Sequence, residues 1–190
     1  MIWHKFIQSE TKASYLEGLK HLEEKGFQIQ SVTIDGRRGI PDVFKDYPVQ
    51  TCQFHIQKRI STLLTRNPKT QAGKELKQIN DLFIKNKLTE KELGKTLALY
   101  CKRKYYFLSE KNEQGKYKHN HIIQALRCFK RNMKYLFTYQ EYSSLNIPHH
   151  TNHIDGGINT KLKALVWLHR GMKLERRNKL LLNLLYNLKG

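Results

Sequence analysis

Residues 31–55 read SVTIDGRRGIPDVFKDYPVQTCQFH, and this stretch decides the fold. An apolar-rich run, residues 32–34, ends on the acid Asp35, and Gly36 follows it. A short helical stretch and a second strand-like run come next. An acid at the carboxyl end of a strand, followed by a glycine turn, is where open α/β folds place their chemistry. Asp35 is therefore the first candidate site residue, although a surface Asp-Gly turn has the same pattern.

Three strands alternate with two helices in the first 55 residues of the prediction. Residues 2–7 form a short strand, and Ser9 caps the helix that follows. Residues 27–34 form the second strand, Pro41 opens a short helix, and residues 49–54 form the third strand. This alternation predicts an α/β fold with a mostly parallel sheet.

The rest of the chain is predicted to be helical. Residues 56–140 carry no strand signal, and a capping box formed by Thr89 and Glu92 opens one helix to about Leu108. Residues 146–190 predict a loop and two further helices. The expected parts are a partial α/β core over residues 1–55, a helical insertion over residues 56–145, and C-terminal helices over residues 146–190 that complete the core.

Positive charge is concentrated in the helical part. The chain has 35 Lys and Arg against 16 Asp and Glu, a formal net charge of +19. Residues 1–55 carry 7 basic and 7 acidic side chains, whereas residues 56–140 carry 20 basic and 6 acidic ones, a net charge of +14. Such a field favours nucleic acid or another polyanion as the partner. We therefore predict that the insertion is basic and binds DNA.

Basic and aromatic side chains are interleaved between residues 100 and 139. The basic ones would contact phosphates, and the aromatic ones could stack on unpaired bases or pack the helices together, of which packing is preferred. Arg37 and Arg38 lie beside Asp35, where they would contact a phosphate or stand in an exposed turn. The predicted DNA-binding residues are Arg37, Arg38, Lys102, Arg103, Lys104, Arg127, Lys130, Arg131 and Lys134.

Cysteine usage and hydropathy indicate the compartment. Cys52, Cys101 and Cys128 are an odd, widely spaced set, which suits a reducing environment rather than a disulfide framework. No apolar run reaches the roughly 18 residues that a membrane span requires. The start, MIWHKFIQSE, lacks the apolar stretch of a signal peptide. We expect a cytoplasmic protein that does not bind a membrane.

Two motifs resemble a known family. The run IDGRRGI with YPVQTCQFHIQKRI, and the later TNHIDGGINTKLKALVWLHRGM, are similar to the Mutator-type branch of the DDE transposases that bacterial insertion sequences encode. In that family a strand ends in the second catalytic acid, a Cys-x-x-His lies on the next strand, and a third acid opens a helix after a helical insertion. The resemblance implies a ribonuclease-H-like fold, and metal-dependent cleavage and strand transfer at transposon ends.

The resemblance assigns the acids. Asp35 and Asp155 would be catalytic and would bind the metal, with Mg²⁺ (or Mn²⁺) as the cofactor. Asp155 stands where the family usually has glutamate. The alternative for Asp155 is a capping pair with Asn152 at the start of a helix.

Cys52 and His55 would be secondary residues near the same site by this resemblance. Their spacing alone is also typical of a buried cysteine beside a hydrogen-bonded histidine. A zinc site is the third interpretation, with His149, His150 or His153 as further ligands, although one such pair is weak evidence for four-coordinate zinc.

The family's first catalytic acid lies on an earlier strand, which we do not find in this sequence. We therefore expect a truncated transposase, or the downstream piece of a split frame, that is inactive alone. For activity, the missing first acid would have to come from upstream sequence. Strands missing between residues 2–7 and the Asp35 strand would leave sheet edges exposed. The alternatives are a non-catalytic DNA-binding remnant and a decayed open reading frame. A homo-oligomer remains an option, since family members usually act as oligomers.

Overall fold

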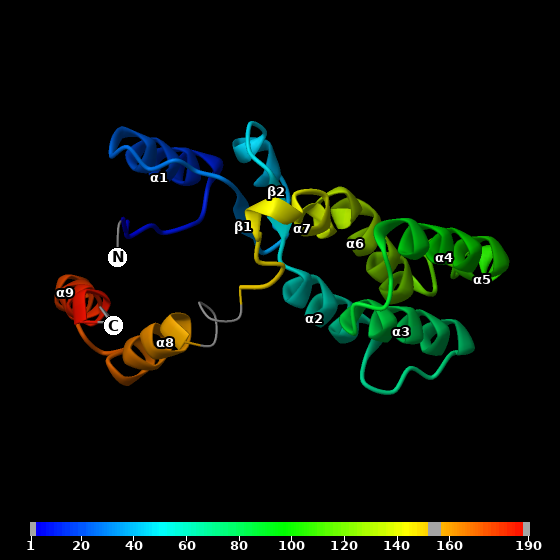
Figure 1. The fold of residues 1–190 in the computed structure, drawn as a ribbon. Coiled ribbons are helices and arrows are strands. Elements are labelled where there is room, and N and C mark those ends of the chain that lie inside the picture. The colour runs from blue at the N-terminus through cyan, green and yellow to red at the C-terminus, as the bar shows by residue number, and fades with distance from the viewer. Residues whose placement is uncertain (1–2, 152–156, 188–190) are drawn as a thin grey trace.

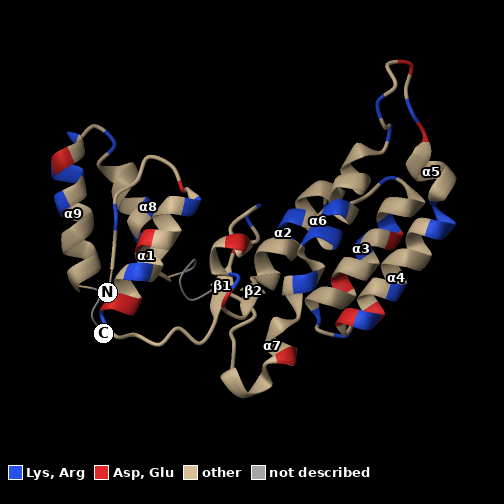
Figure 2. Ribbon diagram, turned by 90° about the horizontal axis from the view of Figure 1, so that it is seen from above, with Lys and Arg blue, Asp and Glu red and all other residues tan. Residues whose placement is uncertain are grey.

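The computed structural model describes residues 3–151 and 157–187. The chain combines one small parallel sheet with a larger number of helices, so it is a mixed α/β structure that is mostly helical (Figure 1). The sheet lies in the middle. Helices α2 to α6 extend to one side of it, whereas α1, α8 and α9 lie on the other side (Figures 1 and 2).

The sheet consists of β1 (Val32–Ile34) and β2 (Val49–Thr51), joined through the short 3-10 helix η1 (Pro41–Phe44). The two strands are parallel, with Val32 opposite Val49, so the predicted parallel arrangement is confirmed for this pair. All three residues of β2 are buried, but only Ile34 of β1 is. The two strands therefore differ in how far they are covered.

The strand predicted at residues 2–7 and most of the one predicted at residues 27–34 do not form. Residues 3–7 belong to no strand, and the second strand begins only at Val32. A strand exists only where a neighbour accepts and donates ladder hydrogen bonds. Among residues 3–151 and 157–187, β2 is the only strand paired with β1, and it covers one edge of β1. The other edge has no strand partner among these residues.

The placement of Cys52 and His55 on a strand was also wrong. β2 ends at Thr51 because helix α2 (Gln53–Leu64) begins almost at once. Cys52 is the N-cap residue of α2, and His55 lies in its first turn. Both side chains therefore stand at the junction between a strand end and a helix start.

Helix α1 (Lys12–Glu24) begins at Thr11 rather than at the predicted cap Ser9. Thr11 forms a capping box, since its hydroxyl accepts a hydrogen bond from the Ser14 amide at 3.2 Å and its own amide donates to the Ser14 hydroxyl. Gly18 is the only fully buried residue of α1, so the helix covers little of the sheet.

The helical body consists of α2, α3 (Gln71–Ile84), α4 (Glu90–Arg103) and α6 (Asn120–Leu136). The capping box predicted at the start of α4 is present, with the Thr89 amide donating to Glu92 at 2.8 Å. The single helix expected as far as Leu108 is divided at Lys104, where the short helix α5 (Tyr105–Ser109) begins.

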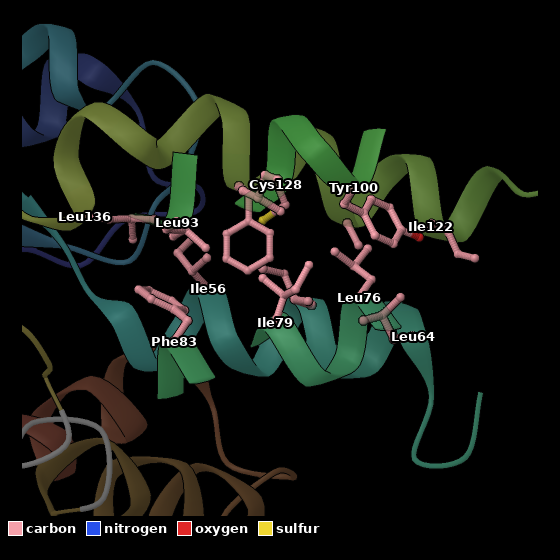
Figure 3. Close-up of a cluster of buried hydrophobic side chains, with 14 of the residues drawn as sticks. Ile56, Leu64, Leu76, Ile79, Phe83, Leu93, Tyr100, Ile122, Cys128 and Leu136 are labelled. Atoms are coloured by element: carbon pink, nitrogen blue, oxygen red, sulfur yellow. The ribbon is translucent and has the colours of Figure 1, made fainter. Parts of the chain in front are cut away.

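Apolar side chains from all four helices meet in the centre of the helical body (Figure 3). The rings of Phe83 and Phe129 are 5.7 Å apart in an edge-on arrangement, and both are almost fully buried. Tyr100 is equally buried, and its hydroxyl donates to the Ala72 carbonyl at 2.9 Å. Each such side chain contributes about 1.5–3 kcal/mol by burial, so the helical body has a core of its own.

Buried amides fix the helical body to the sheet. The side-chain amides of Gln50 and Gln53 both donate to the Leu136 carbonyl, at 3.0 and 2.9 Å, at the end of α6. In α7 (Thr138–Glu141), the Thr138 hydroxyl donates to the Val49 carbonyl at 2.7 Å. A second 3-10 helix, η2 (Ser143–Leu145), follows. These bonds place the end of α6 directly against β2.

The last two helices, α8 (Asn159–Leu168) and α9 (Leu174–Asn187), pack on each other without any fully buried residue. Trp167 remains 65% exposed, so this pair is covered far less than the helical body. Within the described ranges, no helix has the length and apolarity needed to cross a membrane.

Candidate functional site

Asp35 directly follows β1 at the carboxyl end of the parallel sheet, and its side chain is exposed. One of its oxygens, Oδ1, accepts a hydrogen bond from the Arg37 amide at 3.1 Å, which closes a tight turn. The conformation of this turn requires glycine at the next position. Gly36 has φ +79°, and a Cβ there would lie 2.7 Å from Ile56 Cδ1. The Asp35 carboxylate is thus held on a turn that packs against α2.

The same turn also touches α6. A Cβ at Gly36 would lie 3.1 Å from Oδ1 of Asn132, a buried residue near the end of that helix. The Asn132 amide donates to the Cys128 carbonyl at 2.7 Å, which fixes its orientation. Asp35 and the carboxyl-terminal half of α6 are therefore neighbours in the structure, although about 100 residues separate them in sequence.

The two arginines of the turn differ in their contacts. Arg37 forms an ion pair with Glu10, which also accepts a hydrogen bond from the Tyr15 hydroxyl at 3.2 Å. Burial and the nearby charge of Asp35 raise the pKa of Tyr15, so this hydroxyl stays protonated at neutral pH. Arg38 is exposed. Arg37 therefore joins the Asp35 turn to the segment before α1.

Residues 147–151, the return segment, bring the chain back to the sheet after the helical body. The Thr33 hydroxyl donates to the Pro148 carbonyl at 3.0 Å, and the backbone amide of Gln53 donates to the His149 carbonyl at 2.8 Å. The backbone amide and the hydroxyl of Thr151 both lie 3.3 Å from Cys52 Sγ. The return segment is thus bound where β1 and β2 end, on the edge that carries Asp35.

Asp155, the second predicted acid, lies outside the described residues, as do Asn152 and His153. Thr151, whose contacts with Cys52 are described above, precedes Asp155 by four positions. Sequence reasoning did not select Thr151. The only sequence signal at Thr151 was its place as the first residue of the motif TNHIDGG.

Cys52 is fully buried, and its sulfur receives both hydrogen bonds from Thr151. His149 packs its ring on Tyr139 at 5.0 Å and on His150 at 4.5 Å, and burial lowers the pKa of His149, so its ring is neutral at pH 7. Residues 3–151 and 157–187 contain no group of three or more His, Cys, Asp or Glu side chains arranged to hold a metal. Cys52 thus takes part in packing the return segment.

The basic residues predicted on α6 form one stripe. Arg127, Lys130, Arg131 and Lys134, here called the basic stripe, repeat at three- and four-residue intervals and are all exposed. The residues that α6 buries, such as Ala125 and Phe129, lie on the opposite face. Residues 120–136 contain no Asp or Glu. The charged residues on the exposed face of α6 are therefore all cationic.

Helix α2 adds to this cationic surface. Burial raises the pKa of the Cys128 thiol. The positive charges of Arg59 on α2 and Arg131 on α6 partly offset this rise. Lys58 and Arg59 are exposed. Sequence reasoning missed Arg59, because only the packing of α2 against α6 brings it near the basic stripe.

The basic residues predicted at the end of α4 have other contacts. Lys104 Nζ lies 2.7 Å from Glu75 Oε1, and Arg103 lies 3.7 Å from the other oxygen of the same carboxylate. The hydrogen bond from Lys104 is the main reason why the pKa of Glu75 is lowered. Lys102 is exposed. Two of these three cations therefore join α4 to α3 within the helical body.

No protein-family model, no curated protein and no solved structure matches this chain.

Proposed function

We propose that this chain is the catalytic region of a DNA transposase with a ribonuclease-H-like core. The observation that carries the proposal is Asp35 at the carboxyl end of β1, on a turn that packs against α6, a helix whose charged residues are all cationic. Cleavage of a DNA phosphodiester needs a carboxylate that can hold a metal ion and cations that hold the phosphates around it. The chain has both: the carboxylate lies on the Asp35 turn, and the cations lie on the face of α6 opposite to the one that packs on this turn.

The path of the chain supports the ribonuclease-H-like interpretation. β1 and β2 are parallel, the helical body follows β2, and the return segment then binds at the edge that carries Asp35. A basic helical insertion that leaves the core and returns to it accounts for this path. In the proposal, Asp155 is the second acid, and the return segment leads the chain toward it from Thr151.

The chemistry of Asp35 suits Mg²⁺ or Mn²⁺. Its carboxylate is exposed and accepts one backbone hydrogen bond, which leaves oxygen positions for a cation. Mg²⁺ is usually bound through one or two carboxylates together with substrate phosphates. When bound, such an ion stabilises charge on the attacking and leaving oxygens. We propose that a further acid comes from another segment and that the chain alone does not cut DNA.

The contribution of the basic stripe can be tested by DNA binding. Fluorescence anisotropy with a labelled duplex is measured over a series of salt concentrations. A variant with Arg127, Lys130, Arg131 and Lys134 changed to Gln is expected to bind at least about tenfold more weakly. The slope of log affinity against log salt concentration is expected to become less steep by about 0.9 for each DNA phosphate that the variant no longer neutralises.

A matched control removes the same charge elsewhere. Lys85, Lys87, Lys91 and Lys95 are exposed at the end of α3, in the turn that follows and on α4, and they are changed to Gln together. If the two variants lose affinity equally, net charge rather than the basic stripe binds DNA, and the proposed interface is wrong.

Metal binding at Asp35 can be tested without any DNA cleavage. Fe²⁺ takes the place of Mg²⁺, and with ascorbate and peroxide it cuts the polypeptide beside the ion. We expect a cut near residue 35 that excess Mg²⁺ suppresses and that Asp35→Asn abolishes. Asp46→Asn is the control, since Asp46 is exposed on the loop after η1. A wild-type chain without this cut would have no metal at Asp35.

The second candidate function is DNA binding without catalysis. It is favoured by the exposed cations of α6, which account for DNA affinity without any metal. It predicts the stripe-dependent DNA affinity with no cut at residue 35 and no response to Mg²⁺. The three cysteines, all free, support a reducing, cytoplasmic location for either function.

A further inference from the structure

A groove of about 530 Å³ runs along α1 between two extended segments. Residues 3–7 form one wall, and residues 29–33, which lead into β1, form the other. Every second residue of the first segment, Trp3, Lys5 and Ile7, lines the groove. This alternation is what an extended chain with one face turned to a sheet would show.

The second wall is the unpaired edge of β1. The Val32 amide donates to the Pro48 carbonyl at 3.0 Å, and the Ile34 carbonyl accepts from the Cys52 amide at 2.6 Å. In a parallel ladder the residue between them turns its own amide and carbonyl to the other side. The backbone of Thr33 therefore faces the groove, where the described part of the chain provides no strand to pair with it.

The third side is the apolar face of α1. Tyr15, Leu19 and Leu22 line the groove, and each is only half-buried. Helix α1 follows the first extended segment and precedes the second. Its apolar face borders the space between them, which is the groove.

We propose that this groove is a docking site for a β-strand supplied by another polypeptide. The strand would pair with the edge of β1 at Thr33 and place apolar side chains against Leu19 and Leu22. A helix would not serve, because its backbone groups are already bonded internally and leave those of Thr33 unpaired. This inference concerns partner binding and does not depend on DNA cleavage or on metal at Asp35.

The probe is a fluorescein-labelled peptide of alternating Val and Thr, about six residues long as strands usually are, with a lysine at each end for solubility. Titration of the full chain into the peptide is followed by anisotropy. We expect saturable binding, together with slower hydrogen exchange of the Thr33 amide. The same peptide with alternate N-methylated amides is expected not to bind, since it cannot complete the ladder.

Two pairs of variants place the binding on this groove. Thr33→Pro removes the amide that faces the groove and is expected to weaken binding at least about tenfold, a loss of 1.4 kcal/mol. Thr33→Val removes only the hydroxyl bond to Pro148 and is expected to bind normally. Leu19→Lys is expected to weaken binding similarly, whereas Leu16→Lys, at an exposed position outside the groove, is expected to leave it unchanged.

Three results would overturn the proposal. These are no binding by the wild-type chain, equal binding by Thr33→Pro and Thr33→Val, and a self-association that Leu19→Lys abolishes while the peptide stays unbound. The last result would mean that a second copy of this chain fills the groove. DNA affinity, measured on the same samples, reports folding of the helical body separately from the groove.

Discussion

The helical body and the region around α1 and the sheet differ in how completely they bury their apolar side chains. Sixteen buried residues form a single cluster in the helical body, from Ile56 to Phe137. The cluster shared by the sheet, η1 and α1 has four, namely Ile34, Ile40, Phe44 and Val49. The first region has a closed core, whereas the second has an open groove beside its strand.

This difference follows from the range of the contacts that each region needs. A helix satisfies its backbone within itself, and four of them close a core by packing neighbouring faces. A parallel strand depends on partners that are distant in sequence, and two strands alone are marginal. The helical body can therefore be expected to fold by itself, while the region around β1 is expected to gain order from a strand partner.

The largest expected effect is in the centre of the helical body. Phe129 is fully buried and packs on Phe83, so Phe129→Ala should lower the free energy of unfolding by about 3–5 kcal/mol. Phe44→Ala removes the same group from the smaller cluster and should leave the unfolding of the helical body within about 0.5 kcal/mol of the wild type. Urea titration followed by far-ultraviolet circular dichroism measures both. Equal losses would mean that the two regions unfold as one unit.

The next effect tests the junction between the regions. Gly36→Ala adds a Cβ at φ +79°, in contact with Ile56 and Thr51, and should cost about 2–4 kcal/mol from strain and overpacking together. Gly115→Ala is the matched control, because its φ is +73° but nothing lies within 4 Å of the new Cβ. It should cost only about 1 kcal/mol. If both variants lost a similar free energy of unfolding, the Asp35 turn would not be closely packed against α2.

The smallest effect is a pH dependence inside the helical body. The pKa of Glu75 is lowered from its ordinary value of 4.5, chiefly by the hydrogen bond from Lys104. Its contribution to stability is therefore present above pH 4.5 and is lost as the pH falls through the lowered value. Glu75→Gln should flatten the acid side of the stability curve, measured by thermal melts over a pH series. Glu113→Gln, in an exposed loop, should leave the curve unchanged.

Local signals predicted the helices and the end of β1 well. The capping box of α4 is found as expected, because a cap acts within one turn of a helix. The parallel pair β1 and β2 is found too, with only the short helix η1 between the two strands. The strand expected at residues 2–7 failed for the opposite reason. Its apolar pattern describes the face it would present, but a strand also needs a neighbour, which sequence pattern does not supply.

The candidate site shows the same limit. Asp35 could be selected from sequence because the strand, acid and glycine are consecutive. The contact of its turn with Asn132 could not, since it depends on how α6 packs against the end of the sheet. Likewise, the strand-like pattern of residues 49–54 does not reveal that α2 begins at Gln53.

Because Cys52 is buried, the labelling of its thiol reports the opening of the return segment. The sulfur is fully covered and is capped by the amide and hydroxyl of Thr151, so an alkylating reagent reaches it only after that segment lifts from the sheet. When the segment closes again faster than the reagent reacts, the rate at which the thiol is labelled equals the fraction of open molecules multiplied by the intrinsic rate of labelling. A bound DNA or strand that clamps the return segment would slow the labelling without touching the cysteine.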